Sequence, residues 1–407
     1  MKKLKYLFTH KTASLTWFFI LMFLEMVFAN LAHPATPFLI EQRGFPAYTF
    51  GFAFSAMAFT NFLFSPFWGL MSNRYGRMKV YLIGCLGYAL GQLTFALAMT
   101  FWMVIVARMI SGFFVGAVMV MHLTVVMDYS SQDSMASNLT IHATVFTISG
   151  AVGYLVGGFL GDVSLTLMFT AQIIGLAFSG ILAYMTFLQI PISKDELLKK
   201  HNWVKEINPI SSFIVTKKYV KGIVWVFLLV VFFAQVGSIA FDQAFNFFIR
   251  DQFKFLPSYN GILKAGFGVL SLVINSTIGI YLVRKTGQQR PLSWVLFFMG
   301  ILSNVLFVLY NQTLFIVVAI SLFVLNSIYL ILVQTIAGTL GRKIDHSLFM
   351  GLFNAIKSFG MIIGSSMVGL VYSVSAYGSF IFSGVFFLLA AILLVYFSYA
   401  SKKGRLT

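Results

Sequence analysis

Five charged side chains fall inside long apolar stretches of the sequence, where their types and positions could do chemistry. They are Glu25, Arg108, Asp242, Lys264 and Lys357. A charge at the centre of a membrane costs about 2.5 to 3.5 kcal/mol on insertion scales, so each one needs a partner or a function. Carboxyl groups at such positions suit proton exchange or cation binding, and basic groups suit a carboxylate or an anionic ligand.

Asp242 lies on a polar stripe. Gln235, Ser238, Asp242 and Asn246 follow one another at spacings of three, four and four residues, which places them on one side of a helix. We expect Gln235, Ser238 and Asn246 to line a substrate cavity. We expect Asp242 to exchange a proton or to bind a cationic ligand, with competition between the two. A structural ion pair between Asp242 and Lys264 is the alternative.

The other buried charges allow two interpretations each. Glu25, near the middle of the first apolar stretch, could take part in proton or substrate coupling, or could serve as a local hydrogen-bonding group. Arg108 shares a helix side with His122 and could act beside a carboxylate or as a hub for backbone carbonyls. We expect His122 and Lys357 to line the substrate cavity, with Lys357 as partner of a carboxylate or a substrate anion. No metal site and no cofactor are expected.

The composition indicates a membrane protein. Of the 407 residues, 59% are hydrophobic and 10% charged, with a mean hydropathy of +0.90. A soluble domain is far less apolar. Repeated stretches reach the roughly 20 residues that a transmembrane helix needs, and runs such as "GIVWVFLLVVFFAQVGSIAF" lack the alternation of a barrel strand.

The basic residues orient the chain. All but six of the 28 Lys and Arg residues lie before the first apolar stretch, after the second, sixth, eighth or tenth, or in the tail. By the positive-inside rule both termini are cytoplasmic, which also explains the net charge of +17 without a nucleic-acid partner. The loops that carry Arg43, Arg250 and Lys254 then face the predicted outer side.

The pattern predicts an all-α integral membrane protein with twelve transmembrane helices in two pseudo-symmetric six-helix halves. The halves are residues 1–190 and 219–407, and a basic cytoplasmic loop, 191–218, joins them. A weak repeat of "GLMSNRYGR" in "GIYLVRKTGQQR" supports the division, as in secondary transporters. The expected helices lie near 14–38, 47–70, 79–99, 102–126, 136–160, 165–189, 220–249, 260–283, 291–310, 313–337, 347–371 and 377–400.

Three segments resemble the major facilitator superfamily, and within it the twelve-span drug:proton antiporters, such as Gram-positive multidrug exporters. The segment "GLMSNRYGR" matches the family's loop signature, with Asn73 in place of its aspartate. The segment "RMISGFFVGA" resembles the helix 4 pattern through Arg108. The segment "GAVGYLVGG" resembles the helix 5 antiporter signature, with Tyr154 in place of its proline. The cytoplasmic gate motif comprises Gly69, Asn73, Arg74, Gly76, Arg77 and Asp128.

The resemblance also implies contacts. Arg77 should pair with Asp128, and residue 73 should cap the eleventh helix near Ser347. We expect Gly69 to permit close helix approach and Gly76 to permit the turn. Glycines at short intervals in the fifth helix predict close packing against a neighbour. They are Gly150, Gly153, Gly157 and Gly161.

Together these features favour a proton-coupled exporter of lipophilic or cationic small molecules (multidrug efflux) in a bacterial cell membrane. Its expected partners are a small-molecule substrate, protons and the lipid bilayer, and it is expected to act as a monomer. Two alternatives stay open: an importer or lipid-linked glycan flippase, motivated by Tyr154, Lys357 and Arg108, and a non-transporting sensor or scaffold that uses 191–218. No enzyme is expected, because the chain has no phosphate-binding loop and no recognisable nucleophile constellation.

Overall fold

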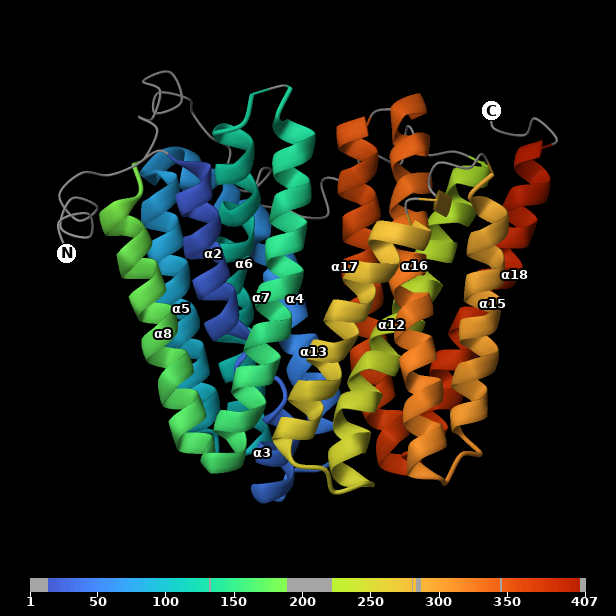
Figure 1. Cartoon of the computed structure of the whole chain (residues 1–407), viewed down its shortest axis with the longest axis horizontal. Coiled ribbons are helices and arrows are strands. Elements are labelled where there is room, and N and C mark those ends of the chain that lie inside the picture. The colour runs from blue at the N-terminus through green and yellow to red at the C-terminus, as the bar shows by residue number, and fades with distance from the viewer. Residues whose placement is uncertain are drawn as a thin grey trace. The chain divides into compact units, whose positions relative to one another are not determined.

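The computed structural model describes residues 14–131, 133–188, 222–279, 281–282, 287–344 and 346–402. Every element in these ranges is a helix (Figure 1). The elements are α2 (Leu15–Asn30), α3 (Thr36–Gln42), α4 (Thr49–Tyr75), α5 (Arg77–Ala96), α6 (Phe101–Asp128), α7 (Met135–Val163), α8 (Leu165–Thr186), α12 (Ile223–Asp251), α13 (Pro257–Ile274), the π-helix η1 (Asn275–Gly279), α15 (Gln289–Leu306), α16 (Gln312–Ile344), α17 (His346–Val374) and α18 (Gly378–Lys402).

The all-helical prediction is confirmed, and each predicted helix has a counterpart in the same order. Nine of the described helices are long and apolar enough to cross a membrane. Helices α2, α5 and α15 are not among these nine, so the count of twelve spans stays a prediction.

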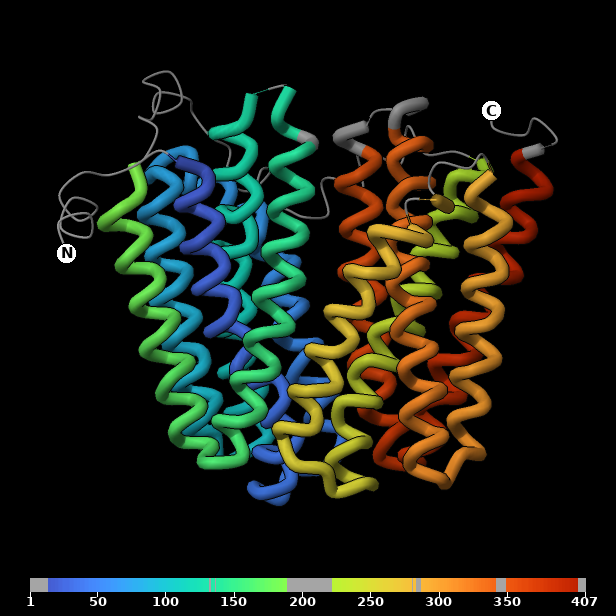
Figure 2. The backbone as a smooth tube through the Cα atoms, in the orientation of Figure 1, coloured from blue at the N-terminus to red at the C-terminus, as the bar shows by residue number. Residues whose placement is uncertain are grey.

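Two predicted helices are interrupted. The helix expected at 14–38 ends at Asn30 and resumes as α3 at Thr36, because Pro34 lacks the backbone N–H that a continuous helix needs. The break can be followed along the tube in Figure 2. The helix expected at 260–283 turns into a π-helix at Asn275, where the Asn275 side chain accepts a hydrogen bond of 2.7 Å from Ser327.

The described helices form two compact units. In unit 1, α5 packs against α6 and α8, and α2 packs against α7 and α8. In unit 2, α12 packs against α17 and α18, and α15 packs against α16 and α18. Large aromatic side chains fill both interiors; Tyr81 and Phe18 are fully buried in unit 1, as are Phe245 and Phe248 in unit 2.

The units differ from the predicted halves in two segments. Residues 40–58 belong to unit 2, and residues 256–268 belong to unit 1. In unit 2, Ser55 donates a 3.0 Å hydrogen bond to the carbonyl of Ile362. In unit 1, the amide of Asn260 donates to the carbonyl of Pro34 at 3.1 Å. Each unit therefore contains helix ends from both parts of the sequence. The predicted loop 191–218 lies outside the described residues.

The glycines of α7 pack as predicted at three of four positions. A Cβ atom at Gly153 would lie 2.6 Å from the carbonyl oxygen of Val27 on α2, and one at Gly157 would overlap the backbone of Leu31. At Gly161 it would lie 3.0 Å from the Cβ of Ala35. Gly150 has nothing within 4 Å, so the packing prediction is wrong there. The backbones of α2 and α7 thus approach closely over two helical turns.

Candidate functional site

A buried acid–base pair lies inside unit 1. Glu25 on α2 and His122 on α6 are 0% and 1% exposed, and their Oε2 and Nε2 atoms are 3.3 Å apart. Neither oxygen of Glu25 receives a hydrogen bond from a described residue. The sequence singled out both residues, and the structure brings them together, although His122 was expected to line a substrate cavity.

Aromatic side chains surround this pair. The hydroxyl oxygen of Tyr81 on α5 lies 3.4 Å from Nε2 of His122. The ring of Phe18 meets the His122 ring edge-on, with centroids 6.3 Å apart. The ring of His142 on α7 lies at the same centroid distance from His122. The pair is therefore enclosed by rings from α2, α5 and α7, away from bulk water.

The Glu25–His122 pair can hold one proton without a net charge. The proton can reside on the carboxyl group, giving two neutral groups, or on the imidazole, giving an ion pair. A second proton, or the loss of the first, leaves a net charge in the apolar interior, which is costly unless a ligand compensates for it. Such a pair can link proton exchange to the arrival of a charged molecule.

Arg108 lies far from this pair. It precedes His122 by fourteen residues on α6, which is about 21 Å along a helix. Its Cζ atom lies 3.7 Å from the centroid of the Phe95 ring, and Nη2 is 3.5 Å from the hydroxyl oxygen of Thr36. These contacts are an aromatic ring and a hydroxyl, not the backbone carbonyls of the alternative interpretation. A role of Arg108 in proton coupling stays a prediction.

The stripe on α12 lies in unit 2, and its first two residues are buried. Ser238 donates a 2.7 Å hydrogen bond to Oδ1 of Asn326 on α16. Gln235 lies against Gly360 of α17, where an added Cβ would come within 3.0 Å. Asp242 and Asn246, further along the stripe, are half-buried. Since Asp242 belongs to unit 2 and Lys264 to unit 1, their pairing stays a prediction.

The loop between α4 and α5 adopts the geometry that its motif implies. Nε of Arg77 lies 2.8 Å from Oδ2 of Asp128, which confirms the predicted contact. The same guanidinium donates to the side chains of Ser72 and Asn73. Gly76 has a φ of 95°, which favours glycine, as predicted for the turn. Asn73, in the last turn of α4, thus contacts Arg77, the first residue of α5. The side chain of Ser347, its expected neighbour, lies outside the described residues.

Two further motif residues can be placed. A Cβ atom at Gly69 would lie 4.0 Å from the nearest atom, on Val120, which is ordinary contact. The prediction that Gly69 permits close helix approach is therefore wrong. Arg74 points its guanidinium toward the ring of Tyr75, at 5.6 Å from the centroid.

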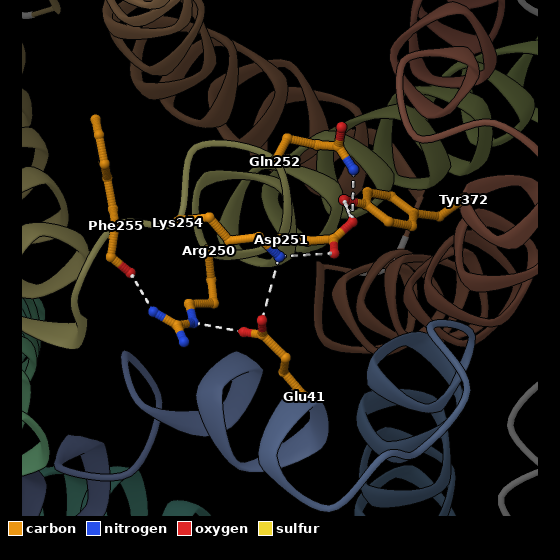
Figure 3. A network of polar contacts seen from close by, with 7 residues as sticks. All are labelled: Glu41, Arg250, Asp251, Gln252, Lys254, Phe255 and Tyr372. Atoms are coloured by element: carbon orange, nitrogen blue, oxygen red, sulfur yellow. Dashed lines mark hydrogen bonds and ion pairs between the residues drawn. The ribbon is translucent and has the colours of Figure 1, made fainter.

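Unit 2 contains a second polar cluster, the Glu41 network, in the part of the chain predicted to face the outer side. Figure 3 shows its residues, which are Glu41, Arg250, Asp251, Gln252, Lys254, Phe255 and Tyr372. Oε2 of Glu41 on α3 accepts a 2.6 Å hydrogen bond from Arg250 at the end of α12, and Oε1 lies 3.2 Å from Nζ of Lys254. Asp251 accepts 2.8 Å hydrogen bonds from Tyr372 and Gln252. The network ties α3, which precedes α4, to the ends of α12 and α17.

The two cations of the Glu41 network should contribute unequally to stability. The Arg250 side chain is 19% exposed and also donates to the carbonyl of Phe255, whereas the Lys254 side chain is 62% exposed. We expect Arg250→Ala to lower the free energy of unfolding by about 1 to 2 kcal/mol. The matched variant Lys254→Ala should cost less than about 0.5 kcal/mol. Thermal unfolding of the purified variants in detergent measures both, and equal losses would contradict the assignment.

Sequence reasoning missed Tyr81, Asn326 and the Glu41 network. Tyr81 could have been found from the sequence, because it begins a polar stripe on one side of α5. The stripe consists of Tyr81, Cys85, Tyr88 and Gln92, which recur at helical spacing. The Glu41 network has a signal too. The predicted outer loops carry few cations, and two of them, Arg250 and Lys254, lie close in sequence to Asp251. Asn326 follows no pattern in the sequence.

Comparisons with known proteins identify the family and agree with the fold. The model of the Major Facilitator Superfamily matches residues 18–345. "Multidrug resistance protein 2" of Bacillus subtilis (strain 168) is 22% identical over 375 residues, covering 91% of this chain and 92% of that protein. Two solved structures share the fold, a bacterial homolog to the human lysosomal transporter Spinster and a D-xylose-proton symporter.

The Spinster homolog has a TM-score of 0.76 at 14% identity, covering 97% of this chain and 98% of that one. The D-xylose-proton symporter has a TM-score of 0.69 at 15% identity, covering 94% of this chain and 97% of that one. The family match spans most of the chain, and the nine apolar helices agree with a protein that crosses a membrane many times. This chain belongs to the Major Facilitator Superfamily and is a membrane transporter rather than an enzyme.

Proposed function

We propose that this transporter exports lipophilic, cationic small molecules across a bacterial cell membrane in exchange for protons. The observation that carries the proposal is the buried Glu25–His122 pair, whose carboxylate oxygens receive no hydrogen bond from a described residue. A protonatable pair of this kind inside a membrane-spanning unit suits proton coupling. Similarity to a multidrug resistance protein of Bacillus subtilis supports export and a drug-like substrate.

The chemistry of the proposed exchange is a competition for negative charge. A cationic substrate that enters from the cytoplasmic side favours the deprotonated acid, and a proton that arrives from outside favours release of the substrate. Glu25 is the candidate for this acid in unit 1, and Asp242 on the α12 stripe is the candidate in unit 2. The cytoplasmic location of both termini and the monomeric state are parts of the same proposal.

The Arg77–Asp128 pair and the Glu41 network are the contacts that we propose to form and break as the transporter changes conformation. The Arg77–Asp128 pair lies at the predicted cytoplasmic end of unit 1 and the Glu41 network at the predicted outer end of unit 2. Alternating access requires contacts at each membrane face to form and break in turn. Ion pairs of partly exposed residues suit this purpose, because each contributes about 2 kcal/mol or less.

Efflux from cells tests the proposal. Cells that produce the protein are loaded with a panel of cationic dyes and drugs, and retention is followed with and without a proton uncoupler. We expect lower retention than in cells without the protein, and the uncoupler should abolish the difference. Efflux that persists with the uncoupler would contradict proton coupling.

Import is the second candidate, because the D-xylose-proton symporter shares this fold. The same experiment separates the two directions. An importer raises the amount of compound inside energised cells, whereas an exporter lowers it. Accumulation of any panel compound that depends on the protein and on the proton gradient would favour import.

A further inference from the structure

Lys357 on α17 is a cation deep inside a membrane-spanning helix. It lies eleven residues after His346, where α17 begins, or about 16 Å along the helix. A lysine near a helix end can extend its amine to the lipid headgroups, but this depth puts the headgroups out of reach. The amine therefore needs an anionic or polar partner inside the transporter.

The protein supplies little to Lys357. Its Nζ atom lies 5.6 Å from the centroid of the Phe353 ring, near the limit of a cation–π contact. Among the residues whose side chains the structure describes, none forms an ion pair or a hydrogen bond with it. By contrast, Arg77 and Arg250 each contact a carboxylate, at 2.8 and 2.6 Å. The amine of Lys357 thus keeps its capacity to donate hydrogen bonds.

A second polar group with unused capacity lies close by, on α12. Lys357 and Gly360 are three residues apart and share a side of α17. A Cβ atom at Gly360 would lie 3.0 Å from the Cβ of Gln235. Gln235 is 7% exposed; its Oε1 atom, an acceptor, is buried without a hydrogen-bond partner, and no described residue accepts a hydrogen bond from its Nε2 amide, the donor that the proposal uses. A lysine amine and an uncommitted amide therefore occur at the same contact between α12 and α17.

Aromatic rings border this contact. Phe232, three residues before Gln235 on α12, stacks on Phe359 of α17 with centroids 5.8 Å apart and an interplanar angle of 27°. An amine and an amide N–H can both donate to one carboxylate, and flat rings can stack on an aromatic molecule. The local chemistry suits an aromatic carboxylate.

We propose that Lys357 binds the carboxylate of amphoteric aromatic substrates, with Gln235 as a second hydrogen-bond donor. The proposal rests on the proposed export function and narrows its substrate class. A cationic group elsewhere on the same molecule would reach the stripe of α12, where Asp242 lies seven residues beyond Gln235 on the same helix side. A substrate with both charges would then contact the lysine and the acid at once.

Rhodamine B and its ethyl ester test the proposal, because they share a chromophore and differ in the carboxylate. Uptake of each dye into energised inside-out vesicles is compared between the native protein and the variants Lys357→Met, Lys357→Arg and Lys264→Met. We expect Lys357→Met to reduce rhodamine B uptake about tenfold and ester uptake less than about twofold. Lys357→Arg should retain uptake of both dyes. Lys264 is a second intramembrane lysine, and Lys264→Met should change the uptake of both dyes to the same extent.

Binding of both dyes to the purified native protein separates this proposal from the export function. The carboxylate site predicts that rhodamine B binds more tightly than the ester, and that this preference is lost in Lys357→Met and weakened in Gln235→Leu. Such binding supports the carboxylate site even if the vesicles show no uptake. Absence of uptake together with this binding would overturn the export function alone. Equal loss of both dyes in Lys357→Met would assign the lysine to coupling or folding and overturn the carboxylate site. Unchanged binding and uptake of both dyes would also overturn it.

Discussion

Replacing Glu25 with glutamine should abolish substrate-driven proton movement while the protein stays folded. Glutamine has nearly the same shape, so the packing of α2 is preserved, but it cannot release a proton. The remaining partner, His122, lies 3.3 Å away and loses its neighbouring carboxyl group. We expect the rate of proton movement on substrate addition to fall by at least about tenfold, or about 1.4 kcal/mol. Inside-out vesicles with a pH-sensitive dye measure it.

Two further variants make this result specific. Glu25→Asp keeps the carboxyl group and should retain part of the activity, which a purely structural role would not predict. Asp242→Asn tests the other candidate acid, on α12 in unit 2. Proton movement that persists undiminished in Glu25→Gln would refute the role of Glu25, and the same result in Asp242→Asn would refute that of Asp242.

Alanine at Gly157 should destabilise unit 1, whereas alanine at Gly150 should not. A Cβ atom at Gly157 would overlap the backbone of Leu31 on α2, and a backbone cannot move aside as a flexible side chain can. We expect Gly157→Ala to lower the free energy of unfolding by about 3 kcal/mol or more, at or beyond the upper end of overpacking effects. A Cβ at Gly150 meets nothing within 4 Å, so Gly150→Ala should gain up to about 1 kcal/mol from helix propensity.

The contrast between these two glycines is measured by thermal unfolding of the purified variants. Gly153→Ala, whose Cβ would lie 2.6 Å from a carbonyl oxygen, provides a milder case if Gly157→Ala yields no folded protein. Equal stability of Gly150→Ala and Gly153→Ala would contradict the close approach of α2 and α7.

The order of the helices was predictable from the sequence, because long apolar stretches separated by short polar segments have few other solutions in a membrane. The Arg77–Asp128 contact followed from a motif. Glu25 and His122 were both singled out as polar groups in apolar stretches. Their contact could not be predicted, because it depends on how α2 and α6 are rotated about their own axes.

Other features follow from tertiary packing alone. Periodicity places Gly150 and Gly157 on one helix side, yet α2 reaches Gly157 and leaves Gly150 open. Tyr154, which replaces the proline of the antiporter signature, stacks on His33 with centroids 5.5 Å apart. The Glu41 network joins residues more than 200 positions apart in the chain. Single-sequence patterns describe each helix but not its partner.

Proton exchange by the purified transporter tests the central claim most directly. The protein is reconstituted into liposomes that contain a pH-sensitive dye, and a gradient of a cationic substrate is imposed without a pH gradient. We predict that substrate movement drives protons in the opposite direction, and that Glu25→Gln removes this proton movement. Substrate movement without any change of internal pH in the native protein would contradict proton-coupled export.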